Sequence, residues 1–149
     1  MAIIGNYTFD SCASLTNATV FGNDTSLGDG AFENCTNLAA VDLSGVTSIG
    51  TTAFLGDTGL TSVTLGDSVT NMGHWVFWDC ASLRTISLPD SLASIGDSTF
   101  FDCASLTNAT VGSGLVDLNG AMFDSCTKLR AVFFRGNAPS QNPSTFLDC

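Results

Sequence analysis

One short frame recurs along the whole chain and limits what the chain can fold into. The frame is a phenylalanine, a cysteine three residues later, and then Leu-x-x-Ile-x-Leu, as residues 77–88 show. A tandem repeat of this length is typical of solenoids, in which each unit buries its apolar face against its neighbours. The anchor phenylalanines follow one another at steps of 23, 22, 23, 23, 23 and 23 residues: Phe9, Phe32, Phe54, Phe77, Phe100, Phe123 and Phe146.

The apolar positions inside each repeat predict one short strand per repeat. A leucine follows each anchor by six residues in the first six copies, as Leu83 does, and two further apolar positions follow it, Ile86 and Leu88 in the fourth copy. Their spacing of two residues is that of a strand with one buried face. We therefore expect six stacked strands, with the anchors, the leucines and both strand positions buried.

These residues carry a family resemblance. The chain resembles the BspA-type (Treponema-type) leucine-rich repeat through the frame Leu83-x-x-Ile86-x-Leu88-Pro89-x-Ser91-Leu92-x-x-Ile95-Gly96-x-x-x-Phe100-x-x-Cys103. The resemblance implies a right-handed solenoid with a parallel β-sheet on one face and short turns, 3-10 or strand segments on the other. It also implies a surface or secreted protein, since family members are often linked to adhesion.

The resemblance covers residues 1–149 as a single solenoid domain, with about six 23-residue repeats and a partial seventh. We expect this solenoid to be a segment of a longer array, because both ends of the sequence fall inside a repeat. The third copy departs from the frame at Asp57, which stands where the other copies have cysteine.

Charge and length restrict the possible partners. The formal net charge is −10, with only four basic residues, so a nucleic acid backbone would be repelled. The longest apolar runs are too short to span a membrane. No signal peptide pattern opens the sequence, so an extracellular or cell-surface location is expected from the resemblance alone.

No residue pattern indicates a catalytic or metal site. Each of the six cysteines follows an anchor by three residues, and no Cys-x-x-Cys or Cys/His set occurs. Parallel stacking does not converge their side chains as a disulfide requires, so we expect free thiols in a buried column; disulfides or a metal site are the alternatives. His74 is the only candidate base near neutral pH. We expect no enzyme activity and no cofactor.

An aromatic strip is the first candidate binding surface. Leu55, Trp78 and Phe101 occupy the position after the anchor in three consecutive copies, and Trp75 lies close to Trp78 in sequence. If the anchors point inward, these neighbours point elsewhere and form an exposed apolar surface of the kind that marks interfaces. The alternative is that the rings fold over the solenoid edge as additional core.

A polar strip on the sheet is the second candidate surface. Small hydroxyl and amide groups could bind a protein or glycan through adaptable hydrogen bonds, could match an ordered surface such as ice, or could merely be solvated. We call these outward positions the sheet-face strip: Asn17, Thr19, Asp42, Thr64, Thr85, Ser87, Asn108 and Thr110.

The sequence is best interpreted as a non-enzymatic scaffold that binds an extracellular protein or glycan in an adhesion-type interaction. The alternative from another class is a structural spacer that self-associates, in which the repeats set the length and the ends join copies. Three of the four basic residues, Lys128, Arg130 and Arg135, lie in the sixth repeat and could favour such contacts.

Overall fold

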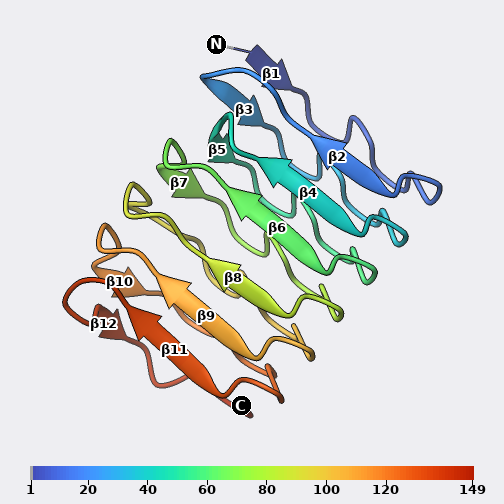
Figure 1. Ribbon diagram of the computed structural model, residues 1–149. Helices are drawn as coiled ribbons and strands as arrows, with labels where there is room; N and C mark the ends of the chain where they lie inside the picture. The colour runs from blue at the N-terminus through green and yellow to red at the C-terminus, as the bar shows by residue number, and fades with distance from the viewer. Residues whose placement is uncertain (1) are drawn as a thin grey trace.

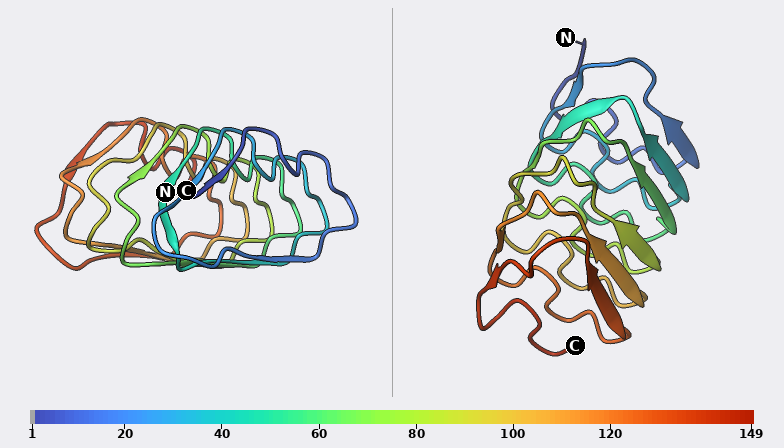
Figure 2. Two further views of the ribbon diagram at one scale, coloured as in Figure 1. Left: turned by 90° about the horizontal axis from the view of Figure 1, so that it is seen from above. Right: turned by 60° about the vertical axis from the view of Figure 1, so that its left-hand side comes forward.

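The computed structural model describes residues 2–149 as an elongated coil of short parallel strands and turns, with no helix among them. Successive turns of the coil stack along one direction, and the two termini lie at opposite ends (Figure 1). The further views show that the strands form two series on different sides of the coil (Figure 2). The expected repeat solenoid is confirmed.

The first series is the sheet that the Leu-x-x-Ile-x-Leu positions predict. All of its pairings are parallel and join equivalent residues of successive repeats, for example Val41 with Val63 and Ile86 with Ala109. Its strands are β2 (Asn17–Thr19), β4 (Ala40–Leu43), β6 (Ser62–Leu65), β8 (Thr85–Ser87), β9 (Asn108–Val111) and β11 (Ala131–Phe134).

The second series covers the opposite side with shorter strands. Four of them form one parallel sheet, a single bridge from Asn71 to Ser94 extends it, and a separate pair follows. Of the alternatives for this face, the structure therefore has turns and strand segments. The strands are β1 (Ala2–Ile4), β3 (Thr25–Leu27), β5 (Val46–Ile49), β7 (Asn71–Met72), β10 (Asp117–Leu118) and β12 (Ser140–Gln141).

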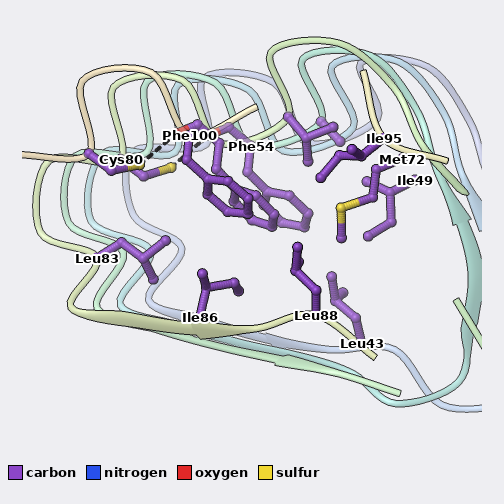
Figure 3. Close-up of a cluster of buried hydrophobic side chains, with 14 of the residues drawn as sticks. Leu43, Ile49, Phe54, Met72, Cys80, Leu83, Ile86, Leu88, Ile95 and Phe100 are labelled. Carbon is purple, nitrogen blue, oxygen red and sulfur yellow. Dashed lines mark hydrogen bonds between the residues drawn. The ribbon is translucent and has the colours of Figure 1, made fainter. Parts of the chain in front are cut away.

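A stack of anchor phenylalanines runs through the core between the two series. From Phe9 to Phe146, the ring centroids of adjacent anchors lie 5.0–5.6 Å apart with nearly parallel planes. Hydrogen-bonded turns repeat at about the strand spacing, so equivalent rings stack on one another. Leu83, Ile86 and Leu88 point into the same core and are buried, which confirms the predicted register (Figure 3).

The expectation that every anchor is buried is wrong at the ends of the stack. Phe9 is 38% exposed and Phe146 is half-buried, because each has a stacked ring on only one side. The leucines of the first and sixth copies, Leu15 and Leu129, are half-buried as well. Several apolar strand positions are also only half-buried: Ala18, Val63, Leu65, Val132 and Phe134.

The six expected strands are present in the first series, but they do not pair as one continuous sheet. The first series consists of two three-stranded sheets, β2-β4-β6 and β8-β9-β11, and no ladder joins β6 to β8 within residues 2–149. At the end of the β9–β11 pair, the Arg135 N–H donates to the Val111 carbonyl at 3.0 Å. The residue equivalent to Arg135 after β8 is Pro89, which has no N–H to donate to β6. The opposite edge stays bonded, with Gly56 N–H to the Trp78 carbonyl at 2.9 Å. The two repeats therefore remain hydrogen-bonded at the turn edge, although their strands β6 and β8 are not paired.

Candidate partner-binding surface

Each anchor phenylalanine lies at the centre of a tight turn that forms one edge of the solenoid. The backbone carbonyl of the residue two positions before the anchor accepts a hydrogen bond from the N–H of the residue that follows the anchor. In the fourth repeat, Trp78 N–H donates to the Trp75 carbonyl at 3.3 Å. This bond closes a turn and brings the two side-chain positions close together. Adjacent turns are joined in their own ladder, with Phe77 N–H to the Thr99 carbonyl at 2.9 Å.

In most repeats the turn has a left-handed backbone at two positions, two residues before the anchor and two residues after it, as at Trp75 and Asp79. The residues two before the anchor include Gly30, Thr52, Trp75 and Ser98, all with φ between 52° and 59°. A left-handed conformation costs a residue other than glycine roughly 1–2 kcal/mol, so glycine suits this position best, although Tyr7 and Ala121 also adopt it there. A tryptophan with φ of 56° at position 75 is therefore not selected by the turn itself.

The structure brings the aromatic strip together on this edge. The ring centroids of Trp78 and Phe101 lie 4.4 Å apart, and those of Trp75 and Trp78 lie 6.5 Å apart in an edge-to-face arrangement. Trp75 is 41% exposed, whereas Leu55, Trp78 and Phe101 are half-buried. The strip thus combines features of both interpretations, because the rings cover part of the edge and still present apolar surface to solvent.

His74 precedes the aromatic strip and has a structural partner. Its Nδ1 accepts the Asp97 backbone N–H at 3.0 Å, and the Asp97 carboxylate lies 3.5 Å from the same nitrogen. Among the surface hollows, the four of about 250–760 Å³ that have the clearest outlines are lined by residues other than His74. No group of three or more metal-ligating side chains is placed to hold an ion in residues 2–149.

The sheet-face strip lies where its alternation predicts. Its members face outward and are exposed, except Asp42 and Thr110, which are half-buried. The pairing aligns Thr19 with Asp42 and Thr64, and on the other sheet Ser87 with Thr110. The strip is interrupted between β6 and β8, so its spacing is not regular along the whole solenoid.

The cysteine column has a structural role at the turn edge. Each buried thiol donates to the anchor carbonyl of the preceding repeat; Cys80 Sγ lies 3.2 Å from the Phe54 oxygen and Cys103 Sγ lies 3.2 Å from the Phe77 oxygen. Burial raises the pKa of Cys35 to about 11 and that of Cys126 to about 12. These thiols stay protonated at neutral pH and are poor nucleophiles. At the ends of the column, Cys12 is half-buried and Cys149 is exposed.

Asp57 replaces a thiol in this column and is fully buried. Its Oδ1 accepts the Cys35 backbone N–H at 2.7 Å, while Oδ2 has no hydrogen-bond partner. Burial raises the pKa of Asp57 to about 8, with a smaller increase from Glu33, although the Cys35 N–H opposes the shift. The sequence marked this position as a departure from the repeat, but the altered pKa depends on the three-dimensional surroundings.

A hollow at the gap between β6 and β8 was not anticipated from the sequence. It has a volume of about 280 Å³ and is lined in part by Val63, Leu65 and Pro89. Arg135 reaches across from two repeats further on, with its guanidinium 3.2 Å from Ser87 Oγ and 3.8 Å from the Asp90 carboxylate. Pro89, at the end of a strand, is the one signal that the sequence carried for it.

Comparison with known families decides the classification. Residues 43–149 match the family model of the BspA type leucine-rich repeat region, with six copies. The chain belongs to this family. BspA-type proteins are commonly surface proteins that take part in protein interactions, and repeat proteins of this kind are generally non-enzymatic scaffolds. Residues 2–149 contain no helix long and apolar enough to cross a membrane.

Solved BspA-like structures share the fold. A leucine-rich repeat protein from Bacteroides ovatus is 31% identical with a TM-score of 0.83, over 89% of this chain and 34% of that one. A leucine-rich cell surface protein from Faecalibacterium prausnitzii is 27% identical with a TM-score of 0.76, over 81% and 32%. The T. pallidum leucine-rich repeat protein is 25% identical with a TM-score of 0.65, over 93% and 76%. The chain spans about a third of the length of the first two. No curated protein matches it.

Proposed function

We propose that this protein is a non-enzymatic surface or secreted scaffold that binds a macromolecular partner, a protein or a glycan, through the aromatic strip. The observation that carries the proposal is Trp75, which is 41% exposed in a left-handed turn where the neighbouring repeats have Thr52 and Ser98; among the other repeats, only the first has an aromatic residue there, Tyr7. Neither burial nor backbone conformation explains a tryptophan at this position. Exposed tryptophans are among the residues that most often dominate binding interfaces.

The rest of the strip supports the same role. Trp78 and Phe101 hold each other in place through their 4.4 Å ring contact, so a partner would meet a preformed surface. A preorganised aromatic surface loses little side-chain entropy on binding. The extracellular location is supported by the likeness to the F. prausnitzii cell surface protein.

The sheet-face strip is a second candidate surface for the same function. Its members project from the paired strands as an exposed row of hydroxyl and amide groups. The interruption between β6 and β8 weakens the ordered-surface alternative, because matching a lattice requires regular spacing along the whole array.

A capture experiment with defined probes tests the proposal. The wild-type protein, Trp75→Ser and a control variant, Phe21→Ser, are passed over immobilised matrix proteins and glycans. Phe21 is an exposed aromatic residue outside both candidate surfaces. We expect capture by at least one probe, weakened about tenfold by Trp75→Ser and unchanged by Phe21→Ser.

Two outcomes would contradict the proposal. Equal capture of the wild-type and Trp75→Ser proteins would remove the aromatic strip as the binding surface and favour the sheet-face strip. Concentration-dependent assembly in light scattering, with no capture by any probe, would favour the self-associating spacer.

A further inference from the structure

Two acidic residues bracket the aromatic strip within its own column of turn positions. In successive repeats the residue after the anchor is Glu33, Leu55, Trp78, Phe101 and Asp124. Backbone hydrogen bonds join these turns one by one, including Asn34 N–H to the Leu55 carbonyl at 2.8 Å and Asp102 N–H to the Asp124 carbonyl at 3.0 Å. Glu33 at one end is half-buried, whereas Asp124 at the other end is buried and its Oδ1 accepts the Ser125 hydroxyl at 2.9 Å.

Two more acidic residues directly follow Trp78 and Phe101 in the sequence. These residues, Asp79 and Asp102, occupy equivalent positions in adjacent turns, both with left-handed backbone. Burial and, to a smaller extent, the nearby Asp102 carboxylate raise the pKa of Asp79. A cation placed near both carboxylates would favour their charged forms.

No positive charge of the protein itself neutralises this edge. Glu33, Asp79, Asp102 and Asp124 form no ion pair with any residue in the range 2–149. Three of the four basic residues of the chain lie in the sixth repeat, and the fourth, Arg84, immediately precedes β8 on the sheet side. The edge thus presents aromatic faces and uncompensated acidic groups together.

This combination favours a cationic ligand. Lysine and arginine side chains bind over tryptophan faces and at the same time pair with carboxylates. A neutral glycan would use the rings but leave the acidic groups without partners, and an anionic glycan would be repelled by a chain of net charge −10.

We propose that the aromatic strip binds a lysine- or arginine-rich segment of a partner polypeptide, with cationic side chains on Trp75 and Trp78 and paired with Glu33, Asp79 and Asp102. This inference rests on the proposed function, because it names the partner class of the same surface. Both tryptophans of the chain belong to the strip, so intrinsic fluorescence reports directly on its occupancy.

The experiment titrates the protein with a short synthetic peptide rich in lysine and arginine, monitored by tryptophan fluorescence and calorimetry. A peptide of the same length with glutamine at every basic position is the matched ligand control, and a neutral oligosaccharide is the third probe. We expect the cationic peptide to bind at least about tenfold more tightly than the glutamine peptide, and its affinity to fall as salt is added.

Variants separate ring contacts from general charge attraction. Trp75→Ser introduces the residue that occupies the equivalent turn position at Ser98 and retains every acidic group. It should weaken binding of the cationic peptide about tenfold, and Glu33→Gln should weaken it about threefold. Phe21→Ser retains the net charge and should bind like the wild-type protein.

Several results would overturn the inference. It fails if the cationic peptide does not bind, if the glutamine peptide binds equally well, or if Trp75→Ser leaves cationic binding unchanged. Saturable binding of the oligosaccharide alone, lost in Trp75→Ser, would overturn the cationic partner while leaving the strip as the binding surface. Capture of matrix proteins and glycans that is insensitive to Trp75→Ser would instead contradict the proposed function itself.

Discussion

Replacing Asp57 by cysteine should make the stability of this protein much less dependent on pH. Asp57 is fully buried in the column that cysteines occupy in the other repeats, and its Oδ2 has no hydrogen-bond partner. A cysteine there can donate its S–H to the Phe32 carbonyl, as Cys80 and Cys103 donate to the anchors of their preceding repeats. The substitution therefore restores the repeat and removes a buried ionisable group.

The expected magnitude follows from the pKa of Asp57 in the two states. The unfolded chain releases this proton near the ordinary pKa of 3.8, whereas the folded chain retains it until about pH 8. The folded state holds more protons between these values, so each pH unit lowers the free energy of unfolding by about 1.4 kcal/mol. The loss is complete above the folded pKa and amounts to about 5 kcal/mol between pH 4 and pH 8.

Urea denaturation of both proteins at several pH values between 5 and 8 provides the test. We expect the advantage of Asp57→Cys over wild type to grow by about 4 kcal/mol across this range, since the other titrating groups are common to both chains. Asp67→Asn, which removes a carboxylate from an exposed turn, is the control. Wild-type and Asp57→Cys curves that run parallel from pH 5 to pH 8 would refute the argument, because they would mean that Asp57 ionises normally in the folded state.

Three further predictions concern the solenoid itself. Phe77→Ala should lower the free energy of unfolding by about 3–5 kcal/mol, because the ring is fully buried between Phe54 and Phe100. Phe9→Ala, at the exposed end of the stack, should lower it by only about 1–2 kcal/mol. Equal losses of unfolding free energy in urea denaturation would contradict the stack. In hydrogen exchange, the Leu65 amide faces the gap and should exchange at least about tenfold faster than the Leu88 amide, because the Leu88 N–H donates to the Thr110 carbonyl at 2.8 Å. Similar exchange rates for the two amides would indicate a continuous sheet. Iodoacetamide should modify Cys149 well before Cys80 and Cys103, whose burial raises the pKa of both thiols; simultaneous labelling of all three would contradict the buried column.

The repeat made most of the fold predictable. Equivalent residues must share one environment when repeats stack, so the positions of Leu83, Ile86 and Leu88 in a single copy determined which face of every strand is buried. The sequence also identified the family, through the same frame.

The structure differs from the predicted fold where the local sequence pattern does not determine the packing. The residues of β6 and β8 have the same alternation as those of the other strands, and the gap between them depends on how whole repeats are oriented, with Pro89 as the only local signal. Phe9 follows the repeat as well as Phe77 does, but a ring with one stacked neighbour remains partly exposed.

The candidate site was predictable in position but not in character. Spacing alone placed Leu55, Trp78 and Phe101 on one edge and left open whether the rings were core or surface. Their half-buried state results from ring contacts such as the 4.4 Å approach of Trp78 to Phe101, which depend on side-chain conformation. The left-handed turn that makes Trp75 unusual was hidden as well, because residues other than glycine occupy that position in most repeats.

Hydroxyl-radical footprinting of the protein, free and bound to the probe that captures it, tests the central claim most directly. The method reports the solvent access of individual side chains, and it distinguishes the two candidate surfaces within one sample. The account predicts that Trp75 and Trp78 become protected on binding while Phe133, exposed on the sheet face, reacts as before. Protection of Phe133 with unchanged oxidation of both tryptophans would contradict it.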